Sequence, residues 1–122
     1  MDVFIAEATP RGRKALAGLL AGIPNVRLVG EADGARSAIA GILEKKPQVV
    51  LLGLKLAEGS GLEVLGEVHA REPGIDCYMI SNFPSEAFRH YAERLGALEF
   101  FDRSAGLEPV REVIAARAAT SH

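Results

Sequence analysis

The sequence predicts an α/β fold in which a five-stranded parallel sheet of order 2-1-3-4-5 lies between two layers of helices. Short apolar runs alternate with amphipathic helical patterns five times along the 122 residues. Such alternation favours a parallel sheet with right-handed crossovers. The run at residues 49–52 is apolar without alternation, which is typical of a central parallel strand covered on both faces. We expect a single domain over residues 1–122.

The first half of the chain shows two strand–helix units and a third strand. Strands are expected over residues 3–6, 26–30 and 49–52. Apolar side chains spaced as on one helix face mark the first helix, namely Leu16, Leu19, Leu20 and Ile23. The second helix is marked in the same way by Ala35, Ile39, Ile42 and Leu43, and it is expected to end where Lys45, Lys46 and Pro47 follow one another.

The second half continues the alternation. Ser60 and Glu63 stand three residues apart before an apolar pattern, as in a capping box, so a third helix is expected to begin there. Strands are expected over residues 75–81 and 98–102. The fourth helix carries Phe88, Tyr91, Ala92 and Leu95, and the fifth carries Leu107, Val110 and Ile114.

Composition narrows the classes of function. Charged residues make up 25% of the chain and the formal net charge is −2, so nothing favours direct binding to nucleic acid or to an anionic membrane. The one cysteine, Cys77, cannot form an internal disulfide and suits a reducing cytoplasm. Asp2 and Glu7 interrupt any apolar leader, and no run approaches the length of a membrane span.

The predicted topology also predicts where a site would lie. In a parallel sheet of this order, ligands bind beyond the carboxyl ends of the strands, near the switch point between strands one and three. That edge is formed by residues 7–10, 53–59, 81–83 and 103–104. Among them, Glu7, Lys55, Ser81 and Arg103 carry polar groups.

Residues 47–65 read Pro-Gln-Val-Val-Leu-Leu-Gly-Leu-Lys-Leu-Ala-Glu-Gly-Ser-Gly-Leu-Glu-Val-Leu, and further motifs are Val29-Gly-Glu-Ala, Gly96-Ala97 and Phe100-Phe-Asp-Arg-Ser104. With these motifs the chain resembles the receiver domains of two-component response regulators over about residues 2–116. The resemblance implies a flavodoxin-like fold and a role in phosphorelay signalling, through contacts with a histidine kinase or another protein.

The residues at the family's functional positions match the family less well than the motifs that indicate the fold. The phospho-accepting aspartate falls on Gly53, and the acidic pair after the first strand falls on Glu7 and Ala8. The hydroxyl position falls on Ser81 and the lysine position on Arg103. The aromatic switch position falls on Phe100, which keeps a ring without a hydroxyl.

These departures predict a degenerate phosphorylation pocket. Phosphoryl transfer needs a nucleophile and a divalent cation, and Mg²⁺ prefers carboxylate oxygens. Here Glu7 would face Arg103 with Lys55 nearby, so we expect weak or absent Mg²⁺ binding, no cofactor and no enzymatic activity. A hypothesis follows that Arg103 forms an ion pair with Glu7, with a bidentate geometry as one option.

The leading interpretation is therefore a pseudo-receiver that acts through protein–protein interaction, with a partner protein or a second copy of itself. The expected partner face, between the fourth and fifth helices, carries Phe88, Arg89, Tyr91, Arg94 and Arg111. No output domain is expected within these residues.

Three alternatives remain open from the sequence. One is a phosphorylatable receiver that uses another acid, such as Glu58, or that is altered at Gly53. Another is a small flavodoxin-like nucleotide-binding protein, although residues 7–13 lack a glycine-rich phosphate loop. The last is a receiver whose vacated pocket holds a small ligand.

Overall fold

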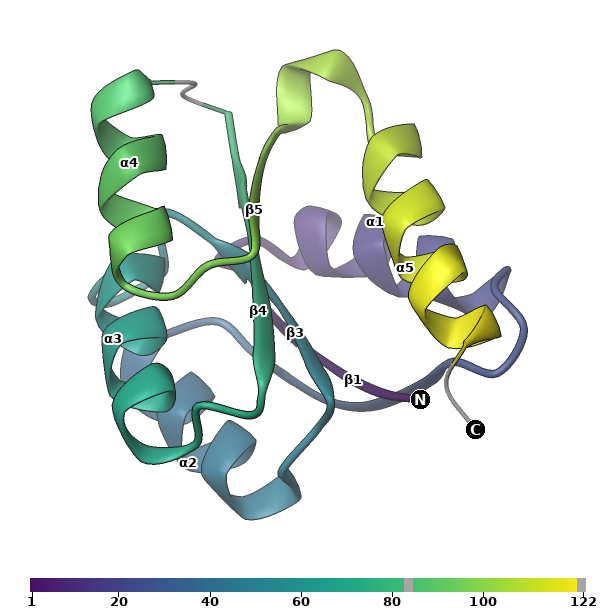
Figure 1. Cartoon of the computed structure of the whole chain (residues 1–122), viewed down its shortest axis with the longest axis horizontal. Coiled ribbons are helices and arrows are strands. Elements are labelled where there is room, and N and C mark those ends of the chain that lie inside the picture. Colours follow the sequence, from purple (N-terminus) through teal and green to yellow (C-terminus); the bar gives the residue numbers. More distant parts are fainter. Residues whose placement is uncertain (83–84, 121–122) are drawn as a thin grey trace.

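The computed structural model describes residues 1–82 and 85–120, and its central feature is a parallel sheet of order β2-β1-β3-β4-β5 (Figure 1). The predicted strand order and parallel pairing are therefore confirmed. The strands are β1 (Asp2–Ala6), β2 (Arg27–Ala32), β3 (Val49–Gly53), β4 (Asp76–Ser81) and β5 (Glu99–Asp102).

Helices cover both faces of this sheet. They are α1 (Pro10–Ala21), α2 (Ala35–Lys45), α3 (Gly61–Arg71), α4 (Glu86–Arg94) and α5 (Glu108–Ala119). Figure 1 shows α2, α3 and α4 on one side of the sheet, and α1 and α5 on the other. The three-layer sandwich expected from the sequence is thus the observed architecture.

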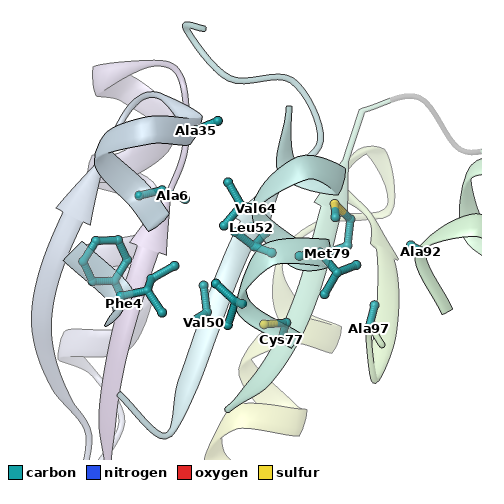
Figure 2. Close-up of a cluster of buried hydrophobic side chains, with 14 of the residues drawn as sticks. Phe4, Ala6, Ala35, Val50, Leu52, Val64, Cys77, Met79, Ala92 and Ala97 are labelled. Carbon is teal, nitrogen blue, oxygen red and sulfur yellow. The ribbon is translucent and has the colours of Figure 1, made fainter. Parts of the chain in front are cut away.

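The two faces of the sheet build two hydrophobic cores from alternate residues of the same strands. On β3, Val50 and Leu52 pack toward α2 and α3, in the core drawn in Figure 2, whereas Val49 and Leu51 pack toward α1 and α5. Every residue of β3 is buried. This burial on both faces explains why residues 49–52 lack alternation.

The helix boundaries follow local capping. Ser60 Oγ accepts a hydrogen bond from the Glu63 N–H at 3.3 Å, so the predicted start of α3 is confirmed. Lys46 ends α2 in the left-handed conformation, with φ of 48°. Thr9 caps α1 in the same way as Ser60 caps α3.

The observed strands differ slightly from the expected ranges. β2 begins at Arg27 and continues to Ala32, where the sequence predicted residues 26–30. A 3₁₀ turn, Arg103–Ala105, follows β5 and was not predicted; the Asp102 carboxylate accepts the Ser104 N–H at 2.9 Å and closes it. Within the residues described, no helix is long and apolar enough to cross a membrane.

Candidate functional site

A small pocket lies at the carboxyl edge of the sheet, where the topology predicted a site. Its volume is about 50 Å³. Glu7 follows β1, Gly53 ends β3, Ser81 ends β4 and Arg103 follows β5, so residues far apart in sequence meet here. Among the described residues, the lining consists of Glu7, Gly53, Leu54, Lys55, Ile80, Ser81, Asn82 and Arg103. The structure therefore brings together five of the six predicted pocket residues.

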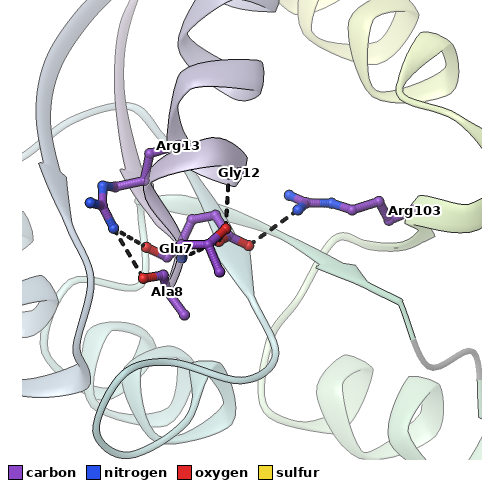
Figure 3. Close-up of polar contacts among 6 residues, drawn as sticks. Glu7, Ala8, Gly12, Arg13 and Arg103 are labelled. Atoms are coloured by element: carbon purple, nitrogen blue, oxygen red, sulfur yellow. Dashed lines mark hydrogen bonds and ion pairs between the residues drawn. The ribbon is translucent and has the colours of Figure 1, made fainter.

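The Glu7 carboxylate is buried and turned toward the first turn of α1 (Figure 3). Its Oε2 accepts hydrogen bonds from the Thr9 N–H at 2.7 Å and from the Thr9 hydroxyl at 3.0 Å. Thr9 Oγ1 in turn accepts the Gly12 N–H at 3.0 Å. Glu7 is thus held at a helix N-terminus, where the helix dipole stabilises negative charge.

The lack of a side chain at Gly12 leaves room for the Glu7 carboxylate in this position. A Cβ atom on Gly12 would lie 2.5 Å from Glu7 Oε2 and 2.8 Å from Thr9 Oγ1. Both distances are too short for a carbon–oxygen contact, so the Glu7 carboxylate and the Thr9 hydroxyl would have to move. Sequence reasoning missed Gly12, although a glycine in the first turn of a helix next to a buried acid was a usable signal.

Arg103 faces Glu7 from the opposite side of the pocket. Its Nη1 lies 3.3 Å from Glu7 Oε1, and the side chains are only 21% and 10% exposed. The predicted ion pair is therefore confirmed. The bidentate option is wrong, because Arg103 Nη2 is buried and has no hydrogen-bond partner among the described residues. Glu7 cannot satisfy both nitrogens, since Thr9 holds its second oxygen.

Gly53 is the residue whose missing side chain shapes the pocket. A Cβ atom on Gly53 would lie 3.3 Å from Glu7 Oε1 and 3.5 Å from the Ala6 carbonyl oxygen. A side chain at this position would therefore point at the Glu7 carboxylate and at its contact with Arg103.

Ala8, the sixth predicted pocket residue, does not line the pocket. Arg13 Nη1 donates to the Ala8 carbonyl at 3.2 Å and to the Glu7 carbonyl at 2.9 Å (Figure 3). A second guanidinium therefore covers the backbone after β1. Sequence reasoning missed Arg13, because nothing in the sequence shows that its side chain reaches back toward β1.

The remaining predicted site residues sit at the pocket edge. Ser81 is buried at 3% exposure, and Lys55 is exposed. Phe83, which the sequence also placed at this edge, lies outside the described residues. Within the described part of the chain, no group of three or more His, Cys, Asp or Glu side chains could hold a metal ion.

Glu58 lies away from the pocket and serves α2 instead. Its carboxylate accepts the Arg36 N–H at 2.7 Å, and its carbonyl oxygen accepts the Ala35 N–H at 2.9 Å. Gly34, the N-cap residue of α2, has no side chain to do this. Glu58 is exposed and supplies this missing cap, and its use as a replacement acid stays a prediction.

Phe100, the predicted switch aromatic, is 4% exposed and belongs to the core beneath α2, α3 and α4. The guanidinium carbon of Arg89 lies 5.6 Å from the centroid of its ring. This distance fits a cation–π contact. Arg89 is thus drawn toward the sheet.

Four of the five residues of the predicted partner face lie on α4. Phe88 and Tyr91 are 42% and 53% exposed, and they line a hollow of about 630 Å³ with the α3 residues Leu62 and Gly66. Arg94 is also exposed on α4.

Arg111, the fifth residue, lies on α5. Its Nη2 reaches the Gly22 carbonyl oxygen, 3.5 Å away, just after α1. The Arg111 side chain therefore turns toward the end of α1, and a partner face shared by α4 and α5 stays a prediction.

Comparison with known proteins identifies the class that this fold and edge pocket define. The model of the response regulator receiver domain matches residues 3–115, so the chain belongs to the receiver domain family of two-component response regulators. The signal receiver domain of the putative response regulator NarL from Mycobacterium tuberculosis has the same fold, with a TM-score of 0.88 at 23% identity over 98% of this chain and 97% of that one.

The curated relatives are longer than this chain. The response regulator GacA of Pseudomonas aeruginosa is 28% identical over 114 residues, which cover 93% of this chain and 53% of GacA. The DNA-binding transcriptional activator DevR/DosR of Mycobacterium tuberculosis is 29% identical over 86 residues, 70% of this chain and 40% of that protein. The chain therefore spans about half the length of the curated relatives it matches.

Proposed function

We propose that this receiver domain is a pseudo-receiver, which does not accept a phosphoryl group and acts through contact with a partner protein. The observation that carries the proposal is Gly53. It occupies the end of β3, where a side chain would point at Glu7, and it offers no nucleophile. Receiver domains work by contacts with histidine kinases and other proteins, and the proposal keeps that role without the covalent step.

The electrostatics of the pocket support the proposal. Transfer of a phosphoryl group to a receiver needs Mg²⁺, and Mg²⁺ is bound through carboxylates. Among the described residues, Glu7 is the one carboxylate that lines this pocket, and both its oxygens are engaged, by Thr9 and by Arg103. A divalent cation would have to displace the Arg103 guanidinium and would meet the charge of Lys55 as well. Mg²⁺ binding is therefore expected to be weak or absent.

The same geometry weighs against the alternatives. Glu58 cannot replace the missing acid without leaving the N-terminus of α2. A nucleotide phosphate at the N-terminus of α1 would meet the Glu7 carboxylate, which already occupies that position through Thr9. The proposal accordingly includes no enzymatic activity and no direct binding of nucleic acid by this domain.

Incubation with acetyl phosphate and Mg²⁺, followed by intact mass spectrometry, tests the proposal. We expect no phosphoryl adduct on the wild-type protein. An amide spectrum recorded with Mg²⁺ and then beryllofluoride should leave the signals of Glu7, Gly53, Ser81 and Arg103 unmoved. A stable phosphoryl adduct, or saturable shifts of these signals on addition of Mg²⁺ alone, would overturn the proposal.

Two variants make the negative result interpretable. The triple variant Ala8→Asp, Gly53→Asp, Arg103→Lys restores the residue types that the family resemblance assigns to these positions, and it should take up the phosphoryl group. Gly53→Asp alone should do so poorly, because Mg²⁺ still lacks a second carboxylate and Arg103 still occupies Glu7. Efficient labelling of this single variant would favour a receiver altered only at position 53.

A further inference from the structure

The pocket beside Gly53 carries a net positive charge. Three charged side chains line it, the carboxylate of Glu7 and the cations Lys55 and Arg103. The Glu7 charge is already compensated, since its oxygens accept two hydrogen bonds from Thr9 and face the Arg103 guanidinium. An anion entering the pocket would therefore meet more attraction than repulsion.

Arg103, which lines the pocket, has one donor that lacks an acceptor among the described residues. Arg103 Nη2 is buried without a hydrogen-bond partner among the described residues, while Nη1 of the same guanidinium faces Glu7. A buried N–H group without an acceptor is costly, and most such groups in folded proteins are paired with protein, water or an ion. Guanidinium N–H groups are strong donors to oxyanions, and Nη2 is the donor of Arg103 that an anion could pair with.

The pocket also has suitable dimensions. A single water molecule needs about 10–15 Å³ of such space. The volume of about 50 Å³ exceeds that several-fold. Gly53 keeps this volume open, because any side chain there would project toward Glu7 Oε1. Ser81 and Asn82 add polar groups to the lining.

We propose that this pocket binds a small tetrahedral oxyanion, of the class of inorganic phosphate or sulfate, reversibly and without a metal ion. The inference rests on the proposed function, because the anion would occupy the space that a phospho-accepting side chain would fill. Bound there, the anion would join the turn after β5 to the ends of β3 and β4. The receiver would then respond to the concentration of an anion and not to a kinase.

Titration of the labelled wild-type protein with sodium phosphate, in the absence of Mg²⁺ and at constant ionic strength set with sodium chloride, tests this inference. Amide shifts of Gly53, Lys55, Asn82 and Arg103 should saturate, with half-saturation on the order of 1 mM. A parallel titration with sodium sulfate distinguishes a site for tetrahedral oxyanions in general from one that selects phosphate. Shifts that never saturate, or that sodium chloride alone reproduces, would overturn the inference.

Two variants locate the anion. Arg103→Gln removes the donor and its charge, and Gly53→Val fills the space with a side chain that suits a strand. Each should weaken phosphate binding by about tenfold or more. If Arg103→Gln proves unfolded, Gly53→Val still decides the question, because it removes none of the three charged groups. Unchanged affinity in the folded variants would place the anion elsewhere and contradict the inference.

Failure of the anion-binding inference can be distinguished from failure of the proposed function. A protein that takes no phosphoryl group from acetyl phosphate and also shows no saturable response to phosphate or sulfate retains the proposed function and loses this inference. A phosphoryl adduct on the wild-type protein would instead remove the proposed function, and with it the vacated pocket on which the anion site depends.

Discussion

Arg103 Nη1 lies 3.3 Å from Glu7 Oε1, and this contact joins the residue after β5 to the residue after β1. Two strands, β3 and β4, separate β1 from β5 in the sheet. The ion pair therefore crosses the carboxyl edge above Gly53 and Ser81. Its exposure is low enough for the contact to matter energetically, unlike most ion pairs at protein surfaces.

Loss of this pair should destabilise the fold measurably. Arg103→Met leaves the buried Glu7 carboxylate without its cation, and we expect a loss of about 1–3 kcal/mol in the free energy of unfolding, measured by urea denaturation. Arg103→Lys should recover part of it. Arg27→Met removes the cation from the exposed pair with Asp2 and serves as the control, for which we expect no measurable change. Equal losses at both positions would show that the edge pair has no special role.

Two glycines of α1 should respond in opposite directions to alanine. Gly18→Ala meets no atom within 4 Å and should stabilise the protein by about 0.5–1 kcal/mol through helix propensity. Gly12→Ala should instead destabilise it by about 1–2 kcal/mol, because the new Cβ displaces the Glu7 carboxylate from Thr9.

A double-mutant cycle checks this cause. In a Glu7→Ala background the carboxylate is gone, so Gly12→Ala should cost less stability, and the close contact with Thr9 Oγ1 at 2.8 Å accounts for what remains. Thermal or urea unfolding of the four proteins gives the coupling free energy between positions 7 and 12. A coupling near zero would mean that Gly12 is needed for another reason.

Glu58→Ala should destabilise α2 by about 1 kcal/mol, since the Arg36 N–H loses its acceptor and the helix loses a negative charge at its N-terminus. Amide hydrogen exchange should show faster exchange at Arg36 in particular. Glu63→Ala provides a comparison on the neighbouring helix, where Ser60 supplies the cap. If Glu58→Ala is silent while acetyl phosphate labels the wild-type protein, Glu58 becomes the candidate acceptor.

Cys77 should be inert in the folded protein. Burial, together with the negative charge of Asp76, raises the pKa of the Cys77 thiol from 9.0 to about 12. At pH 8, the rate at which a thiol reagent modifies Cys77 should therefore be limited by local or global unfolding that exposes the thiol.

The raised pKa also has a consequence for stability. Because the folded state holds the proton more tightly, the contribution of this thiol is complete below pH 9 and is lost as the pH rises from about 9 toward about 12. Urea unfolding of the wild type and of Cys77→Ala across this range checks the effect. The wild type should lose stability more steeply, and parallel curves would contradict the assignment.

The local signals in the chain were sufficient for the fold. The continuous burial of β3, the cap at Ser60 and the spacing of Leu16 and Leu20 each follow from hydrophobic pattern or hydrogen-bonding chemistry within a few residues. The strand order followed from the alternation of strands and helices. Because these signals are short-range, they could be read from the sequence, and the resemblance to receiver domains rested on the same segments.

Contacts over long sequence distances could not be read in this way. The expected pair of Arg103 and Glu7 is present, but its single contact depends on Thr9 holding the other carboxylate oxygen. Glu58 caps a helix that begins 23 residues earlier, and Arg111 turns to the end of α1 and away from α4. The direction of a side chain depends on which backbone groups lie nearby after the chain has folded. The hydrophobic periodicity of the sequence does not predict that direction.

The sequence by itself therefore determined the class of fold, the edge of the sheet that holds the site, and the absence of a side chain at Gly53. The tertiary structure alone decided how the remaining charges are arranged around that position. It turned Glu7 toward α1, left one nitrogen of Arg103 without an acceptor, and separated the α4 aromatics from Arg111. The physical reason is that burial and pairing of a charge depend on every neighbour in space, whereas a strand or a helix depends mainly on neighbours along the chain.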